Sequence, residues 1–483
     1  MTAKTNLACS IAAAAALLLS TAAGAAAQFV IVNGDRPGEG FNDPTPIAPV
    51  GGNPGLTLGQ QRLNAFAYAA SIWGSKLNSN SPIRVLATFD PRPCTDTGAV
   101  LGSAGTTNVF RDPSDFPKTD TWYPFALANK LVGLDIAEIA GPPLFPGYPH
   151  IRAIFNSNLG NPGCLTGSPF YLGLDNSPPV GQVNLVVTLL HELGHGLGFQ
   201  SFTSGTTGAF LGGYPAIWDH YLFDNTIGKN WLGMTNAERA FSAVNPRRVV
   251  WAGQQVTFAA PTVLSLGTPE LSVLAPAALQ GSYLVGTASF GPALDSPGLT
   301  RQVALVVDQA NGTGLACDPL NKENVRRVKQ RIALIDRGTC GFTQKVKNAQ
   351  DAGAVGVIIV DNVVGSPPAG LGGSDPTITI PAVRIALDDG NAIRSAIKST
   401  PSDRSSGVVV RVGVDRSQLN GADELDRVMV YTPSLFSGGS SVSHWDTSAT
   451  RNQLMEPSIS LDLTQSVMPP EDLTLPLFRD IGW

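Results

Sequence analysis

Charged side chains are scarce in this sequence of 483 residues, because Asp, Glu, Lys and Arg together make up only 14% of it. An average globular protein has roughly 25%. The net charge of −5 is mild, and no basic stripe stands out. Nucleic-acid binding needs clustered cations that neutralise phosphates, so nucleic acid is not an expected partner. Glycine and proline are instead abundant, at 52 and 37 residues, which predicts short elements joined by loops.

Long apolar runs are also missing after the N-terminus, so the mature chain is expected to have no membrane span. Residues 1–27 have the pattern of a secretory signal peptide: Lys4 precedes an apolar run rich in alanine, and an A-x-A site ends at Ala27. An uncleaved anchor is the alternative, and the short, alanine-rich run disfavours it. We therefore expect a secreted, extracellular protein.

Cysteine is also rare, with five residues in the sequence. Loss of the signal peptide would remove Cys9 and leave Cys94, Cys164, Cys317 and Cys340. An even number in an exported chain predicts two disulfides, and nearness in sequence favours Cys94 with Cys164 and Cys317 with Cys340. Four free thiols or a second metal site are the alternatives, but the wide spacing has no C-x-x-C character.

Histidine occurs only five times, and two of the five lie in HELGHGLGF, from His191 to Phe199. On a helix, this H-E-x-x-H spacing puts His191 and His195 on one face, one turn apart. Two such imidazoles can hold a zinc ion, which lowers the pKa of a bound water, and Glu192 can take the proton of that water. This is the chemistry of peptide-bond hydrolysis. The alternative is a buried helix whose histidines are merely hydrogen-bonded.

The surrounding sequence supports a helix. GQVNLVVTLLHELGH contains no proline, and apolar residues form a stripe at helical spacing on a side away from the two histidines. The stripe consists of Val186, Leu189, Leu190, Leu193 and Leu197. Three glycines then weaken the helix, so we expect it to end just past His195.

The third zinc ligand is not given by the motif. The extended metzincin pattern needs a histidine at position 201, where this sequence has Ser201. A catalytic zinc normally has three protein ligands and one open position. Residue chemistry favours His444 and leaves carboxylates open; the candidates considered are His150, His220, His444, Asp219 and Glu238.

One family resemblance narrows this choice. HELGHGLGF, a long insertion, SVSHWD, LMEP and the C-terminal LFRDIGW together resemble the leishmanolysin branch of the metzincin zinc proteases. The resemblance covers about 58–223 and 428–483. It implies His191, His195 and His444 as zinc ligands, Glu192 as general base, and Met455 as the residue of a Met-turn beneath the metal.

The sequence departs from that family in one respect. There is no cysteine between Gln28 and Cys94, so a cysteine switch that holds a propeptide on the zinc is not expected.

A second resemblance concerns residues 263–419. RIALIDRGTCGFTQKVKNAQDAGAVGVIIVDN predicts a strand, a helix and a strand, and ITIPAVRIALDDGNAIRSAI predicts a further strand and helix. This stretch resembles the protease-associated (PA) domain that is inserted in exported peptidases. No catalytic constellation occurs in it. Substrate binding, gating of access and recognition away from the cleft are hypotheses for its role, and a passive stabilising module is the alternative.

We therefore expect an α+β fold: a metzincin-like zinc protease domain split by an inserted α/β protease-associated domain. The expected boundaries are 1–27 for the signal peptide, 28–262 and 420–483 for the two catalytic parts, and 263–419 for the insertion. The expected function is that of a secreted endopeptidase with Zn²⁺ as cofactor and proteins or peptides as substrates. An exported peptide-binding or adhesive protein with a non-catalytic metal site is the alternative, and the intact Glu192 counts against it.

Overall fold

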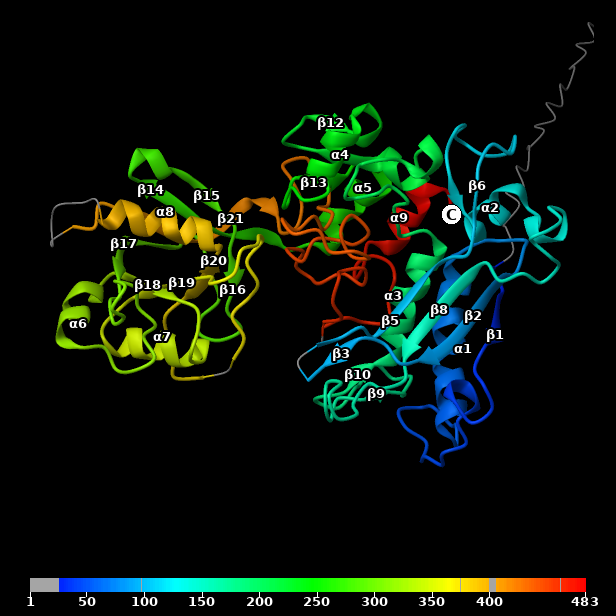
Figure 1. Ribbon diagram of the computed structural model, residues 1–483, viewed down its shortest axis with the longest axis horizontal. Helices are drawn as coiled ribbons and strands as arrows, with labels where there is room; N and C mark the ends of the chain where they lie inside the picture. Colours follow the sequence, from blue (N-terminus) through cyan, green and yellow to red (C-terminus); the bar gives the residue numbers. More distant parts are fainter. Residues whose placement is uncertain (1–25, 97, 374, 399–404, 461) are drawn as a thin grey trace, which may run out of the picture.

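The structure is a computed structural model that describes residues 26–483 except 97, 374, 399–404 and 461. Residues 1–25 of the expected signal peptide lie outside this range. Among the described residues, no helix combines the length and the apolar character needed to cross a membrane. Figure 1 shows two lobes, with the segment from β14 to β21 in the left-hand one.

The right-hand lobe is built on a four-stranded sheet in the order β1-β2-β8-β5. Its strands are β1 (Phe29–Asn33), β2 (Ile83–Asp90), β8 (Ile151–Asn156) and β5 (Gly102–Thr106). The first three run parallel, and β5 pairs antiparallel with β8 at one edge. Alternate residues of β2 are buried, because successive side chains of a strand point to opposite faces of the sheet.

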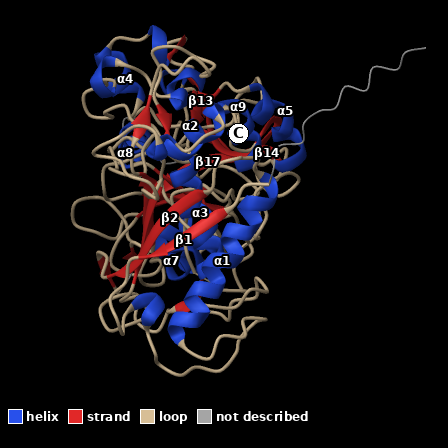
Figure 2. Cartoon of the chain, turned by 90° about the vertical axis from the view of Figure 1, so that its right-hand side faces the viewer, coloured by secondary structure: helices blue, strands red, loops and turns tan. Residues whose placement is uncertain are grey.

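Two helices, α1 (Leu58–Lys76) and α3 (Leu185–Leu197), lie side by side against this sheet (Figure 2). Thr57 caps α1, because its side chain accepts a hydrogen bond from the Gln60 amide. The Trp73 indole of α1 donates to the Leu190 carbonyl of α3 at 3.1 Å. The two helices are therefore fixed to each other through a fully buried side chain.

Shorter elements complete this lobe. The helices are α2 (Phe125–Val132), α4 (Asn236–Ser242), α5 (Gln254–Val263) and α9 (Thr474–Ile481). The remaining strands are β3 (Cys94–Thr95), β4 (Gly98–Ala99), β6 (Val109–Phe110), β7 (Tyr123–Pro124), β9 (Phe170–Tyr171), β10 (Val183–Asn184), β11 (Leu222–Asp224), β12 (Lys229–Asn230) and β13 (Val249–Trp251).

The left-hand lobe contains an eight-stranded sheet in the order β15-β14-β21-β17-β18-β19-β20-β16. Its strands are β14 (Leu266–Ala275), β15 (Gly281–Tyr283), β16 (Gly286–Thr287), β17 (Leu299–Leu305), β18 (Ile332–Asp336), β19 (Gly356–Val360), β20 (Ala382–Ile385) and β21 (Val409–Leu419). Its helices are α6 (Lys322–Val328), α7 (Phe342–Asp351) and α8 (Leu387–Lys398). The expected strand–helix–strand unit is β18-α7-β19, and its two strands are parallel.

The chain enters and leaves the left-hand lobe at one place. Leu266 at the start of β14 pairs with Leu419 at the end of β21. The Asn420 amide then donates to the Ser265 carbonyl at 2.8 Å. The core of the right-hand lobe takes no residue from between Leu264 and Leu419 among the described residues. The left-hand lobe packs its own side chains into two further clusters.

A second contact joins the lobes. The Ser434 amide donates to the Ser366 carbonyl at 2.8 Å, and the Ser366 amide donates to the Ser434 hydroxyl at 2.7 Å. Ser434 precedes the loop that ends at His444. This loop is therefore attached to the left-hand lobe at its start.

Candidate metal centre

Helix α3 has a cap at each end, and it ends where the glycines after His195 predict. Asn184 is its N-cap, and the side chain accepts a hydrogen bond from the Val187 amide. At the other end Gly198 has a φ of 127°, which an L side chain rarely adopts. Every residue between these two caps is buried. The helix is thus a rigid central element that positions His191 and His195.

Three histidines meet beside this helix. The Nε2 atoms of His191 and His195 are 3.2 Å apart, and the Nε2 atom of His444 lies 3.2 Å from His195 and 3.3 Å from His191. His444 comes from the loop that follows Ser434, about 250 positions beyond the helix. Among the described residues, this is the group of three potential metal ligands whose donor atoms converge.

A hydrogen bond at Nδ1 fixes the tautomer of each of the three histidines. Each Nδ1 lies next to a backbone carbonyl: Leu454 O at 2.7 Å for His191, Phe199 O at 2.7 Å for His195, and Ser440 O at 2.9 Å for His444. A carbonyl only accepts hydrogen bonds, so each Nδ1 carries the proton and each Nε2 is left with a lone pair. Carbonyl partners of this kind orient metal-binding histidines.

Three lone pairs aimed at one point repel each other unless a cation lies between them. Zinc–nitrogen bonds of about 2.0–2.1 Å in a tetrahedral site place ligand nitrogens about 3.3–3.4 Å apart. The observed Nε2–Nε2 distances of 3.2–3.3 Å match this nitrogen–nitrogen distance closely. The three imidazoles and their spacing support Zn²⁺ as the cofactor of this site.

Burial keeps the three rings neutral. Desolvation lowers the pKa of His191 to about 4 and, together with the neighbouring His191, that of His195 to about 3. Burial, with the other two imidazoles, likewise depresses the pKa of His444. Because only a neutral imidazole can bind a metal, these shifts prepare all three ligands for a cation at neutral pH.

Glu192 lies between the two helical histidines in sequence and is buried with them. Burial raises the pKa of its carboxyl group to about 8, and a hydrogen bond from the Ala104 amide of β5 and the charge of Arg92 oppose this rise. A divalent cation nearby would also oppose it, because it favours the carboxylate. The β5 edge of the sheet therefore helps to orient Glu192.

Met455 lies directly beneath the helix. A Cβ atom placed on Gly194 would come within 2.7 Å of the Met455 Sδ atom, so the glycine lets the thioether approach the backbone between the two histidines. The Trp445 amide, next to His444, donates to the Met455 carbonyl at 2.9 Å. The segment of Met455 is therefore tied to the segment that carries the third histidine.

Two acids near this segment are buried. The Asp446 carboxylate accepts from the Ser448 amide and hydroxyl, and the Glu456 carboxylate accepts from the Gln453 amide. These contacts hold the backbone on both sides of Met455. Neither side chain is a surface charge.

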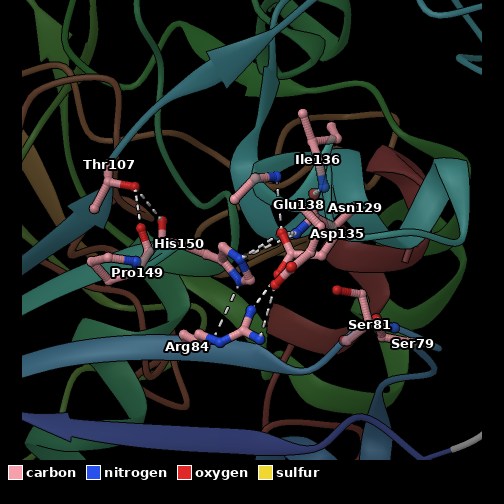
Figure 3. Close-up of polar contacts among 11 residues, drawn as sticks. Ser79, Ser81, Arg84, Thr107, Asn129, Asp135, Ile136, Glu138, Pro149 and His150 are labelled. Carbon is pink, nitrogen blue, oxygen red and sulfur yellow. Dashed lines mark hydrogen bonds and ion pairs between the residues drawn. The ribbon is translucent and has the colours of Figure 1, made fainter. Parts of the chain in front are cut away.

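The other candidate ligands make contacts away from the three imidazoles. Glu238 pairs with Lys229 and caps α4, while Asp219 accepts from Ser201, Thr203 and the Ala216 amide. His220 contacts Thr121. His150 is fully buried, and its ring contacts Asp135 and Asn129 (Figure 3). The structure does not bring any of these four side chains to the three imidazoles.

The site opens into a cavity that sequence patterns did not indicate. Its wall includes most of β5, the loop before His444, and Arg92. Strand β5 has the sequence GSAGT, which lacks the branched and aromatic residues typical of strands. The pairing of β5 with β8 makes it a strand, and no local signal could have identified it.

Both expected disulfides are present. Cys94 is joined to Cys164 next to the cavity, and Cys317 is joined to Cys340 in the left-hand lobe. The first links β3 to the loop that follows β8 and so closes a separation of 70 residues.

Comparison with known protein families identifies one part of the chain. Residues 301–393 match a PA domain. This match lies within the left-hand lobe, between β17 and α8. A zinc-site lobe interrupted by a PA-domain lobe is therefore the arrangement of this chain.

Curated relatives match over short stretches. Leucine aminopeptidase 2 of Trichophyton equinum is 34% identical over 105 residues, which is 22% of this chain and 20% of that protein. The probable lipoprotein aminopeptidase LpqL of Mycobacterium tuberculosis is 29% identical over 209 residues, or 42% of this chain and 35% of that protein. The ER degradation-enhancing alpha-mannosidase-like protein 3 of Xenopus laevis is 37% identical over 83 residues, or 16% of this chain and 9% of that protein.

The chain thus spans no more than about a third of the length of these relatives. Two of the three names describe aminopeptidases, and the third describes an alpha-mannosidase-like protein. Each match covers only part of either chain.

Proposed function

We propose that this protein is a secreted zinc endopeptidase of the metzincin type. The observation that carries this proposal is the convergence of three neutral imidazoles, spaced for tetrahedral zinc, with the carboxyl group of Glu192 on the same helix. The aminopeptidases among the relatives add support for a peptidase. The methionine beneath the helix and the two disulfides support the metzincin type and the extracellular location.

In this proposal His191, His195 and His444 hold the zinc ion. Bound zinc would act as a Lewis acid toward the scissile carbonyl and would lower the pKa of a water molecule. Glu192 takes the proton of the attacking water and delivers it to the departing amine. The Ala104 amide orients the Glu192 carboxylate during both transfers. Met455 supports the helix from below.

The edge strand favours cleavage within a chain. Strand β5 lies at the edge of the sheet with β8 as its one neighbour, and its residues Gly102, Ser103 and Ala104 line the cavity. An extended peptide can add to such an edge through backbone hydrogen bonds. A substrate bound along β5 would pass the metal and continue beyond it.

The donor set also separates this proposal from a two-metal aminopeptidase. Two-metal peptidases hold their ions about 3.5–4 Å apart and need a second set of ligands. Within the part of the chain that the structure describes, the one group of three converging ligands is that of His191, His195 and His444. A single zinc ion therefore fits the site better.

The proposal is tested first with Glu192→Gln. Removing the base should lower kcat/KM by about 10²- to 10⁴-fold, while the protein keeps one zinc ion, since Glu192 is not a ligand. Zinc is measured by atomic absorption and cleavage by mass spectrometry of peptide products. Glu238→Gln is the matched control and should leave kcat/KM unchanged, because this carboxylate pairs with Lys229 and does not lie with the three imidazoles.

The type of cleavage needs a second assay. Peptides with an acetylated N-terminus should be cut internally by the wild-type protein, whereas an aminopeptidase would leave them intact. Chelation should abolish the cleavage. If the wild-type protein binds zinc and peptides but cuts neither acetylated nor free peptides, the peptide-binding alternative is correct.

We also propose the boundaries 28–262, 263–419 and 420–483 for the two catalytic parts and the insertion between them. The paired ends at Leu266 and Leu419 and the separate cores support them. The Ser366–Ser434 contact supports a role of the insertion in holding the loop before His444.

A further inference from the structure

The cavity in front of the metal centre has an uneven distribution of charge. Among the side chains that line it, Arg92 carries the permanent positive charge, and Glu192 is the carboxyl group. The other lining residues are mostly glycine, serine and apolar residues. Arg92 belongs to none of the sequence motifs, and its charge favours the carboxylate form of Glu192.

The backbone of Arg92 is held rigidly. It lies between β2 and β3, with Pro91 before it and Pro93 after it, and proline restricts both its own φ and the preceding residue. The Arg92 amide donates to the Asn156 side chain at 3.3 Å. Cys94, two positions on, is joined to Cys164. The point from which this side chain extends is therefore fixed by the backbone.

The guanidinium group itself is poorly paired. It donates from Nη2 to the Ser103 hydroxyl at 3.0 Å, and this is its one hydrogen bond to the described residues. Its Nε atom is buried and has no partner. None of the ion pairs formed by described residues includes Arg92, whereas the buried Arg384 pairs with Asp361. Four of its five N–H donors thus remain unused.

We propose that Arg92 is a specificity-determining residue that binds a carboxylate of the substrate. An exposed arginine can satisfy its donors with water, but one that lines a cleft loses that water when a peptide fills it. A carboxylate is the group that pairs best with a planar guanidinium, because it accepts two parallel hydrogen bonds. The carboxylate comes from a Glu or Asp side chain or from the C-terminus of a peptide. This inference rests on the proposed peptidase function.

The test uses a neutral, internally quenched peptide in which one Glu is moved along the sequence, with Gln at the same position as the matched control. Wild-type protein should show higher kcat/KM for Glu than for Gln at one position, by about 10- to 100-fold, which is the range of a charge-assisted hydrogen bond. Each peptide is made with a free and an amidated C-terminus. A preference that depends on the free C-terminus identifies that carboxylate as the ligand.

Variants then assign the preference to Arg92. Arg92→Gln should lose the Glu preference, so that its kcat/KM becomes equal for the Glu and Gln peptides, and it should keep its zinc content, because Arg92 is not a ligand. Arg92→Glu should favour Lys at the same position. Arg152→Gln removes an exposed positive charge from the same sheet and should behave as wild type. Ser103→Ala loosens the guanidinium and should reduce the preference partially.

Two outcomes would overturn the inference. Equal cleavage of all Glu and Gln peptides by the wild-type protein would show that Arg92 selects no carboxylate. A loss of kcat on every peptide in Arg92→Gln, with unchanged relative rates, would mean that Arg92 acts on Glu192 and not on the substrate. Absence of cleavage in every protein, wild type included, would instead contradict the proposed peptidase function.

Discussion

Gly194 occupies the position between the two helical histidines where a side chain would meet Met455. Gly194→Ala places a methyl group 2.7 Å from the Sδ atom. Alanine favours helix by about 1 kcal/mol over glycine, but overpacking of this kind costs about 1–3 kcal/mol. We expect a net loss of stability and weaker zinc binding, measured by urea unfolding and by zinc titration with a chromophoric chelator.

Gly233→Ala is the control for this substitution, because nothing lies within 4 Å of a Cβ atom at that position. It should leave zinc affinity unchanged. A Gly194→Ala protein with wild-type stability and zinc affinity would show that the thioether does not support the helix. Met455→Leu conserves volume and should cost less than about 1.5 kcal/mol.

The buried histidines make zinc retention resistant to acid. Protons compete with zinc only below the pKa of each ligand, and burial lowers the pKa of His191 to about 4 and that of His195 to about 3. Zinc content after dialysis should therefore stay constant from neutral pH to about pH 5 and fall below about pH 4. Release with a midpoint near 6.5, the ordinary value for histidine, would contradict this prediction.

At the scale of single residues, the H-E-x-x-H spacing selected His191 and His195 as ligand candidates, and their donor atoms do converge with that of His444. His444 needed the family resemblance, because residue chemistry left Asp219 and Glu238 open. Arg92 was not a candidate, since the role proposed for it depends on which carboxylates are absent around it. Such an absence is a property of three-dimensional packing and has no signature in the sequence.

At the scale of elements, the strongly periodic segments were predicted well. Helix α3 ends at Leu197, as the glycines after His195 indicated. Strand β5 was not predicted, because its glycines and serine show no alternation of apolar and polar residues. It forms only where β8 offers a partner. The element that orients Glu192 thus depends on long-range pairing.

The Cys94–Cys164 disulfide constrains the chain near β5 and Arg92. It closes a separation of 70 residues, for which chain entropy alone gives about 4 kcal/mol of stabilisation. Replacing both cysteines with alanine should lower the free energy of unfolding by about 2–4 kcal/mol and weaken the Glu preference, because the disulfide holds the backbone near Arg92. Thermal unfolding and the peptide pair measure the two effects.

The Cys317–Cys340 disulfide is the matched comparison, with a separation of 23 residues in the other lobe. Its removal should leave zinc content and peptide preference unchanged. If both double variants impaired the peptide preference equally, the effect would be one of general stability and not of the cleft.

At the scale of the whole molecule, the insertion is attached where β14 and β21 pair. Leu266 and Leu419 face each other in an antiparallel register, and a two-residue Asn-Gly turn joins such partners in a hairpin. We therefore expect that replacing residues 267–418 with Asn-Gly gives a folded protein. It should bind one zinc ion and cleave short peptides with kcat/KM within a few-fold of the full chain, because the right-hand core uses no residue from that segment.

A longer deletion that crosses the boundary of the insertion is the control for this experiment. Removing residues 264–420 takes Leu264 and Leu419 out of the core and breaks the Asn420–Ser265 hydrogen bond. Loss of buried leucines costs about 2–5 kcal/mol each, so this longer deletion should unfold or aggregate. The shorter deletion also frees Ser434 from Ser366, which should raise deuterium uptake in the loop before His444. Failure of the shorter deletion to fold or to bind zinc would mean that the PA-domain lobe is needed to assemble the metal centre itself.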